Sequence, residues 1–274
     1  MDAREYLRNG EIGAALQALQ AQIRSEPANA ELRVFLFQLL CVNGDWERAL
    51  TQLNVAGEMD AGTLGMVQVY REAVHCEALR TEVFSGRRSP LIFGDPQRWV
   101  ALLIEALKLT AAGEIAKGQD LRAEAFEEAP ASAGRLNGEP FEWLADADTR
   151  LGPVLEAIVN GRYYWIPFSH VAALRIEEPE DLRDLVWAPA QLKWINGGDA
   201  VALIPTRYPG SETHPDAAVK LARRTEWQDQ GEGCYFGFGQ RMLATDGGEY
   251  ALMEVHDVAL ENPLVEASPA DADG

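Results

Sequence analysis

Two aspartates in the middle of the chain have the spacing that acid–base chemistry could use. Asp146 and Asp148 stand two residues apart, and Arg150 follows them. On an extended segment, residues i and i+2 point to the same side, so the two carboxylates would face one site as proton donor and acceptor. These three residues are the candidate site for an enzyme or a small-ligand binder, in a cleft between the two halves of the chain.

The same residues also suit a purely structural role, which we favour. Asp148 or Thr149 would cap a helix that the sequence predicts over 151–160, and Asp146 would pair with an arginine such as Arg150 or Arg162. Replacing both aspartates with asparagine should then damage folding rather than abolish a reaction. Burial of these acids together with titration near neutral pH would favour the enzyme instead.

Other sequence patterns that carry chemistry are missing. The nucleophile elbow G-x-S-x-G, the zinc motif H-E-x-x-H, the Walker A loop and a C-x-x-C pair do not occur. The segment GFGQRM at 237–242 begins like a dinucleotide loop, but it lacks the third glycine and precedes a predicted strand. The histidines lie far apart, at His75, His170, His214 and His256. We therefore predict no catalytic residue, no cofactor and no metal site.

The composition describes a folded and strongly acidic protein. Of the 274 residues, 47% are apolar, and 24 lysines and arginines stand against 43 aspartates and glutamates, for a net charge of −19. Such a surface repels phosphate backbones and anionic lipids, which argues against nucleic-acid and membrane partners. The three cysteines lack short spacing, and no stretch suits a signal peptide or a membrane span, so we expect a cytoplasmic protein.

Residues 1–130 are predicted to form a tetratricopeptide-like helical domain. GEIGAALQAL at 10–19 aligns with GDWERALTQL at 44–53, at the 34-residue period of such repeats. In each copy, glycine would end one helix, the acidic residue would cap the next, and alanine would let the paired helices approach closely. A further Gly-Glu turn at Gly113 predicts a decayed unit over 102–130. A groove between the repeats would suit a helix or peptide of a partner.

The second half of the chain switches to short strands and turn signals. The segment 131–140 is predicted to be a linker, and 262–274 a disordered acidic tail. Between them, 141–261 should hold one short helix and then six or seven strands, with hairpin turns at 196–198 and 246–248. The predicted fold class is α+β with two domains, in which tetratricopeptide-like repeats precede a small, mostly β, barrel-like domain.

Aromatic side chains are concentrated in this second half. Five of the seven tryptophans lie between residues 143 and 227. Most should be core, but one or two could anchor a partner, because tryptophan and tyrosine dominate interface hot spots. Arg207 and Tyr208 resemble part of an exposed turn with side chains available for contacts. The candidate residues for partner binding or for contact between the domains are Trp143, Asp146, Asp148, Arg150, Trp165, Trp187, Arg207 and Tyr208.

Several strings of the second half also resemble the ImpE/TagJ family of accessory proteins of bacterial type VI secretion systems. They are FEWLADAD (141–148), RLGP (150–153), GRYYWIP (161–167), DLRDLVW (181–187), PTRYPGSE (205–212) and GQRML (239–243). Together with the helical repeats, the resemblance covers nearly the whole chain. It implies a non-enzymatic adaptor with two domains, and it carries over no catalytic residue.

The resemblance also implies partners. Members of the family are associated with the contractile sheath, through an N-terminal helix of its small subunit, and with the AAA+ ATPase that disassembles contracted sheath. Both halves of the chain carry net negative charge, so either would attract a basic partner segment. Two alternatives stay open: the enzyme or small-ligand binder described above, and a peptide-binding repeat protein outside secretion.

Overall fold

The computed structural model describes residues 2–95, 97–231 and 233–261. The segment expected to be a disordered tail, 262–274, lies outside this part of the chain.

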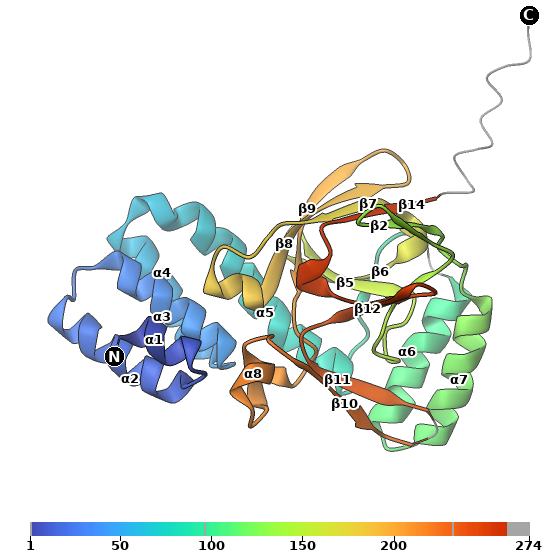
Figure 1. Cartoon of the computed structure of the whole chain (residues 1–274), viewed down its shortest axis with the longest axis horizontal. Coiled ribbons are helices and arrows are strands. Elements are labelled where there is room, and N and C mark those ends of the chain that lie inside the picture. The colour runs from blue at the N-terminus through green and yellow to red at the C-terminus, as the bar shows by residue number, and fades with distance from the viewer. Residues whose placement is uncertain (1, 96, 232, 262–274) are drawn as a thin grey trace, which may run out of the picture.

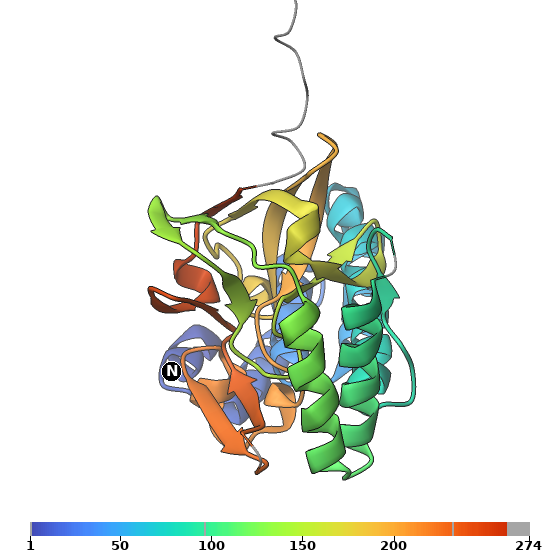
Figure 2. The same ribbon diagram turned by 90° about the vertical axis from the view of Figure 1, so that its right-hand side faces the viewer.

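The first half is helical, as expected, but its helices lie at two ends of the molecule. They are α1 (Ala3–Arg8), α2 (Ile12–Ser25), α3 (Ala30–Val42), α4 (Trp46–Met59), α5 (Leu64–Phe84), α6 (Arg98–Ala111) and α7 (Ile115–Glu128). Figure 1 shows α1 to α4 together at one end, α6 and α7 at the other, and α5 running between them. In Figure 2, α6 and α7 stand side by side in front of the strands. The unit predicted over 102–130 is thus a helical hairpin that lies apart from the first two pairs.

The turn glycines of these helical pairs have the conformation that the repeat pattern predicts. Gly10, Gly44 and Gly113 each follow a helix, with φ angles of 81°, 75° and 85°, which glycine adopts without a steric penalty. The acidic residues after the first two, Glu11 and Asp45, stand at helix N-termini but form no capping hydrogen bond through their side chains. The expected side-chain caps are therefore wrong, although these carboxylates still place negative charge near the helix N-termini.

The second half is built from sheets. Its strands and the short strand before α6 are β1 (Leu91–Ile92), β2 (Gly134–Leu136), β3 (Glu139–Phe141), β4 (Leu144–Asp146), β5 (Val154–Val159), β6 (Arg162–Pro167), β7 (Val171–Ile176), β8 (Trp187–Trp194), β9 (Asp199–Pro205), β10 (Thr225–Asp229), β11 (Tyr235–Gly239), β12 (Met242–Thr245), β13 (Gly248–Ala251) and β14 (Asp257–Leu260). The largest sheet has the order β1-β6-β5-β9-β8-β7-β14-β2-β3. Its pairings are antiparallel except for the parallel contact of β1 with β6.

The expected barrel is wrong, because the large sheet is open. Its outer strands, β1 and β3, do not pair with each other among the described residues, so the ladder never closes. Two smaller sheets accompany it, one with the order β13-β12-β4 and one formed by β10 and β11. Both predicted hairpin turns are confirmed, since 196–198 joins the paired strands β8 and β9, and 246–248 joins β12 and β13.

The helix predicted over 151–160 is also wrong. Within this stretch Val154–Val159 form the strand β5, and all six residues of the strand are buried. Asn160 and Gly161 have φ angles of 50° and 71° and connect β5 to the antiparallel β6. Positive φ at two successive residues is typical of a tight hairpin turn, which Asn-Gly strongly favours. The Asn160-Gly161 dipeptide is therefore the sequence signal that indicates a hairpin between two strands rather than the end of a helix.

The segment 131–140, expected to be a linker, is part of the large sheet. It contains β2 and the first residues of β3, and β2 pairs with β14 near the end of the described chain. The chain therefore passes from helices to strands without a separating linker.

One apolar core joins the two halves. It includes side chains of α1 to α7 together with residues of the sheet region, namely Leu151, Val154, Ile158, Tyr163, Trp165, Val186, Trp187, Leu203 and Leu221. A second core lies on the opposite face of the same strands and contains Leu155 and Ala157 from β5. Alternate residues of β5 thus serve the two cores, as the two-residue period of a strand requires.

Candidate functional site

Asp146 lies on β4 and is enclosed by partners from distant segments. Its side chain is 1% exposed. One carboxylate oxygen accepts hydrogen bonds from the Tyr208 hydroxyl and from the N–H of Asp148, both at 2.9 Å, and the other accepts from the Arg241 guanidinium. The arginine that pairs with Asp146 is thus far away in sequence, rather than one of the two nearby arginines that we expected.

Asp148 is fully buried and holds Arg150 instead of capping a helix. Its Oδ1 accepts hydrogen bonds from the N–H and the Nε–H of Arg150, both at 2.9 Å, and its Oδ2 accepts from the N–H of Gly237 at 2.8 Å. The guanidinium lies over the rings of Phe84 and Phe236, at 5.1 and 4.2 Å from their centroids. Asp148 and Arg150 therefore fasten the loop after β4 to α5 and to β11.

Glu156 on β5 is the centre of a buried charge network. Nε and Nη2 of Arg80, on α5, donate to its two carboxylate oxygens at 2.7 and 3.0 Å. Tyr163 and Arg241 donate to the same carboxylate, and Arg241 also reaches Asp146. We call Arg80, Glu156, Arg241 and Asp146 the buried charge network. It links α5, the large sheet and the three-stranded sheet inside the protein.

The two carboxylates of this network titrate differently. Burial raises the pKa of Asp146 to about 6, and Arg241 offsets this effect only in part. Burial also acts to raise the pKa of Glu156, but Arg80 and Arg241 together outweigh it and hold the pKa at about 2. Asp146 thus meets the titration criterion for an enzyme. Both of its oxygens are nevertheless occupied by protein donors, so the arrangement suits a structural role better than proton transfer to a substrate.

Trp165 and Trp187 are fully buried where the sheet meets the helices. The indole N–H of Trp187 donates to Glu77 on α5 at 2.8 Å, and its ring lies 5.9 Å from that of Trp46 on α4. Trp165 lies against Phe84, with 6.1 Å between the ring centroids. Both tryptophans therefore pack inside the protein between the sheet and the helices, and neither is accessible to a partner.

The prediction that Arg207 and Tyr208 belong to an exposed turn is wrong, because both are buried. Arg207 points at the C-terminal end of α3, where its guanidinium donates to the carbonyl oxygens of Val42 at 2.8 Å and Cys41 at 3.3 Å. The Cys41 carbonyl also accepts from the N–H of Gly44 at 3.1 Å, so the arginine adds a second donor there, supplies a donor to the Val42 carbonyl, and complements the negative end of the helix dipole.

Four residues that join distant parts of the chain were missed from the sequence: the buried Arg80, Glu156 and Arg241, and the exposed Arg223. Arg223 repeats the capping by Arg207, since it donates to the carbonyl oxygens of the last two residues of α1, both at 3.0 Å. Glu156 had a recognisable signal, because it is a lone acid within the apolar run VLEAIV. The arginines had none, since each finds its partner through the fold.

The inner side of the repeats is partly filled by the second half of the chain. A 3₁₀ turn, η3 (Leu182–Leu185), packs on α3 through both of its leucines. The Arg183 guanidinium within it lies 4.7 Å from the Tyr70 ring on α5. Ala217, in the short helix α8 (Ala217–Lys220), joins the same core. A partner helix could not occupy this part of a repeat groove without displacing the protein's own residues.

Trp143 is the candidate residue that the structure leaves at the surface. Its side chain is 41% exposed, and it lines a largely apolar cavity of about 480 Å³ between the end of α7 and β4. Phe126 on α7 lines the same cavity and is 38% exposed. Exposed aromatic rings beside a cavity are typical of sites that bind a partner.

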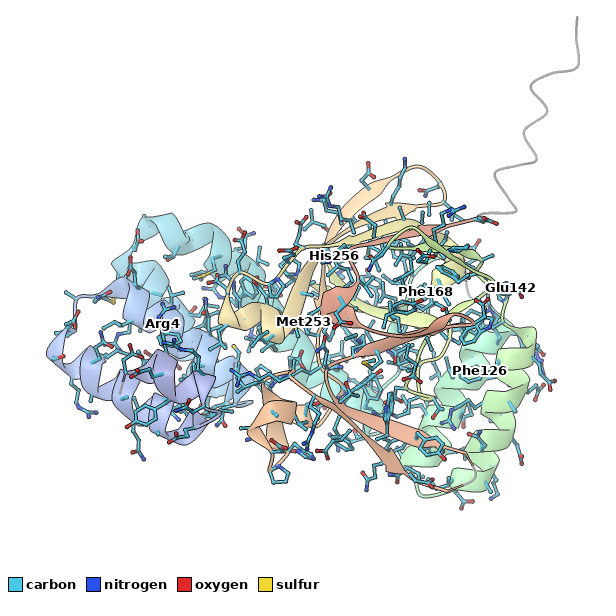
Figure 3. The ribbon with its side chains drawn as sticks, viewed as in Figure 1. Arg4, Phe126, Glu142, Phe168, Met253 and His256 are labelled. Atoms are coloured by element: carbon cyan, nitrogen blue, oxygen red, sulfur yellow. The ribbon has the colours of Figure 1, made fainter. Side chains whose placement is uncertain are left out.

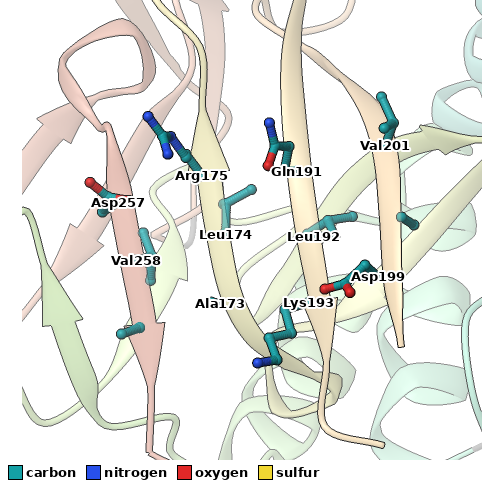
Figure 4. Close-up of a pocket in the computed structure, with 12 residues that line it drawn as sticks. Ala173, Leu174, Arg175, Gln191, Leu192, Lys193, Asp199, Val201, Asp257 and Val258 are labelled. Carbon is teal, nitrogen blue, oxygen red and sulfur yellow. The ribbon is translucent and has the colours of Figure 1, made fainter. Parts of the chain in front are cut away.

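A second hollow lies on the outer face of the large sheet, across β14, β7, β8 and β9 (Figure 4). Its volume is about 420 Å³, and Arg175, Lys193, Asp199 and Asp257 give it charges of both signs. Because side chains of both charges line this hollow, it favours neither a positively nor a negatively charged ligand. Within the described residues, no group of three histidine, cysteine or acidic side chains could hold a metal ion.

None of the helices described for this chain is long and apolar enough to cross a membrane.

Comparison with known proteins agrees with the resemblance seen in the motifs. Residues 138–259 match the family described as ImpE protein, and residues 6–65 match the tetratricopeptide repeat. A type VI secretion system accessory component, TagJ of Pseudomonas aeruginosa, is 54% identical over 261 residues, or 95% of this chain and 92% of TagJ. The crystal structure of a Vibrio parahaemolyticus protein has the same fold, with a TM-score of 0.87 and 22% identity over 96% of this chain and 99% of that one. This chain therefore belongs to the ImpE family.

Proposed function

We propose that the protein is a non-enzymatic adaptor of a bacterial type VI secretion system. In this role it binds the N-terminal helix of the small sheath subunit and assists the handling of the sheath by the AAA+ disassembly ATPase. The observation that carries the proposal is the 54% identity to the accessory component TagJ along almost the entire chain.

The structure supports an adaptor in two ways. The helices and the sheet share a core and a buried charge network, so the surfaces of both ends are held in fixed relation. The carboxylates that could serve catalysis, Asp146 and Asp148, are instead saturated by protein donors. The acidic surface suits a helix with basic residues on its polar face, and apolar residues at i, i+3, i+4 and i+7 would be buried on binding.

The competing function is an enzyme or small-ligand binder that uses Asp146, Asp148 and Arg150. One observation favours it, namely the pKa of about 6 at Asp146. The adaptor proposal expects the double variant D146N/D148N to lose thermal stability because it breaks two buried ion pairs. A double variant that keeps its melting temperature and loses a measurable reaction would instead establish the enzyme.

Calorimetric titration tests the adaptor proposal. The probe is a synthetic peptide of the N-terminal helix of the small sheath subunit, titrated into the full chain, because the shared core makes isolated halves unsuitable. We expect saturable binding that weakens as salt rises, and no binding of a peptide with the same composition in scrambled order. Absence of binding up to about 1 mM, which corresponds to ~4 kcal/mol, would refute the proposal.

A further inference from the structure

The cavity beside Trp143, which we call the Phe126–Trp143 cavity, has walls from several elements of the fold and depends on a glycine at one position. Its walls come from the end of α7, the segment that follows it, β4 and the loop before β5. Gly152 forms part of this wall with a φ angle of 55°, and a Cβ atom there would come within 2.4 Å of the Phe126 ring. Glycine therefore allows Phe126 to lie against the wall while part of the ring stays in solvent.

The cavity also borders the edge strand β4, whose side away from β12 is covered, in the described part of the chain, by Gly152 only at Asp146. β4 stands at the end of the order β13-β12-β4 among the described strands. The N–H of Asp146 donates away from β12, to the carbonyl oxygen of Gly152, whereas the N–H of Ala147 donates to Met242 beside β12. Alternate residues of an antiparallel strand direct their backbone groups to the same side, so the N–H and C=O of Leu144 also point away from β12. Leu144 itself lines the cavity.

The charges around the cavity have one sign. Glu249 lines the cavity, and Glu142 directly precedes Trp143; both are exposed, and neither forms an ion pair with any residue that the structure describes. No lysine or arginine is among the lining residues. Figure 3 shows Phe126 and Glu142 at the same end of the molecule. The one buried acid in the wall, Asp146, is already neutralised by Arg241.

We propose that the Phe126–Trp143 cavity binds an extended segment of a protein partner that has an apolar centre and lysine or arginine on both sides. The apolar side chains fill the cavity against Phe126 and Trp143, and the backbone of the segment pairs with Leu144 as an added strand. The flanking cations lie near Glu142 and Glu249. This site goes beyond the sheath-helix proposal, because it takes an extended segment and lies away from the tetratricopeptide repeats.

Selection from a displayed library of random peptides tests the site without knowledge of the natural partner. Peptides are selected on the full chain alone, and the affinity of each recovered peptide is then measured on the wild type and on the variants. We expect the recovered peptides to share an apolar centre with lysine or arginine flanks. The affinity of these peptides should be at least about tenfold lower for Trp143→Ala and for Glu249→Lys than for the wild type. Added salt should weaken binding to Glu249→Lys less than it weakens binding to the wild type.

The matched control is Trp227→Ala, since Trp227 is 38% exposed on β10 and does not line the cavity. It should leave the affinity of the recovered peptides unchanged, and circular dichroism should show that all three variants stay folded. Recovery of peptides that bind Trp143→Ala equally well, or of peptides with acidic flanks, would overturn the proposal. The sheath helix should bind Trp143→Ala as it binds the wild type, so failure of the sheath proposal remains a separate result.

Discussion

Glu156 is the residue that compensates both arginines of the buried charge network. It is the carboxylate shared by Arg80 and Arg241, and it is fully buried. Removing one member of a buried ion pair leaves the other charge without compensation, which typically costs ~3–5 kcal/mol.

We therefore expect Glu156→Gln to lower the free energy of unfolding by about 3–5 kcal/mol, as measured by urea denaturation. The matched control is Glu58→Gln on α4, which replaces an exposed glutamate that forms no ion pair among the described residues. A change of less than about 0.5 kcal/mol for Glu156→Gln, the size usual for surface substitutions, would contradict the role of the network.

The raised pKa of Asp146 predicts an unusual pH dependence of the free energy of unfolding. Its pKa is raised from 3.8 to about 6 on folding, so the folded state binds a proton more readily than the unfolded state. The stability contributed by this proton is present at low pH and is lost as the pH rises through about 6.

Asp146→Asn removes this titration. The unfolding free energy of the wild type, relative to that of Asp146→Asn, should therefore increase by roughly 1 kcal/mol between pH 7 and pH 5. Denaturation at both pH values provides the measurement. A difference between the two proteins that stays constant, or that shrinks toward pH 5, would show that Asp146 does not titrate in this range.

At the scale of elements, the repeat turns allow a matched comparison. Gly44 and Gly113 occupy equivalent turns with φ angles of 75° and 85°. A Cβ atom at Gly44 would lie 2.8 Å from Cβ of Glu212 and 2.5 Å from its Cγ, whereas a Cβ at Gly113 would meet nothing within 4 Å.

Gly113→Ala should therefore cost only the left-handed backbone strain of about 1–2 kcal/mol. Gly44→Ala should cost this strain and about 1–3 kcal/mol more, because the second half of the chain must yield around Glu212. Thermal and urea unfolding of both variants would measure the difference. Equal costs would mean that the turn at Gly44 does not pack tightly on the sheet region.

The spacing of apolar residues and the turn residues predicted those helices and hairpins that are determined by short stretches of sequence. The helical repeats, their turn glycines and the two hairpins at 196–198 and 246–248 follow from spacing and turn residues alone. The strand β5 was missed because its apolar residues fit a short helix as well, and because Gly161 can end a helix as readily as it can form a hairpin turn. The open sheet was mistaken for a barrel because the closure of a ladder depends on pairings between distant strands.

The interior could not be predicted in the same way. Asp146 and Arg241 are 95 residues apart, and Arg80 and Glu156 are 76 apart. Nothing local to either residue identifies the partner, so nearby arginines were expected instead. For the same reason, the sequence alone did not decide whether Trp165, Trp187 and Arg207 bind a partner or lie in the contact between helices and sheet.

At the scale of the whole molecule, the helices and the sheet should unfold together. Trp187 from the sheet side lies against Trp46 from the repeats, and the first apolar core contains residues of both halves. We expect one cooperative transition in calorimetry, with coincident urea curves from tryptophan fluorescence and far-ultraviolet circular dichroism. Two separated transitions would show that the halves are independent domains.

The capping arginines have a consequence for how the protein is made. The carbonyl of Val42, at the end of α3, receives its arginine donor from Arg207, 165 residues later in the chain, and the carbonyl of Arg8, at the end of α1, receives one from Arg223, more than 200 residues later. At ~5–20 residues per second, a ribosome delivers Arg207 roughly 10–30 s after it has finished α3. The N-terminal repeats are thus synthesised first, and the residues of the second half that pack on them are synthesised last.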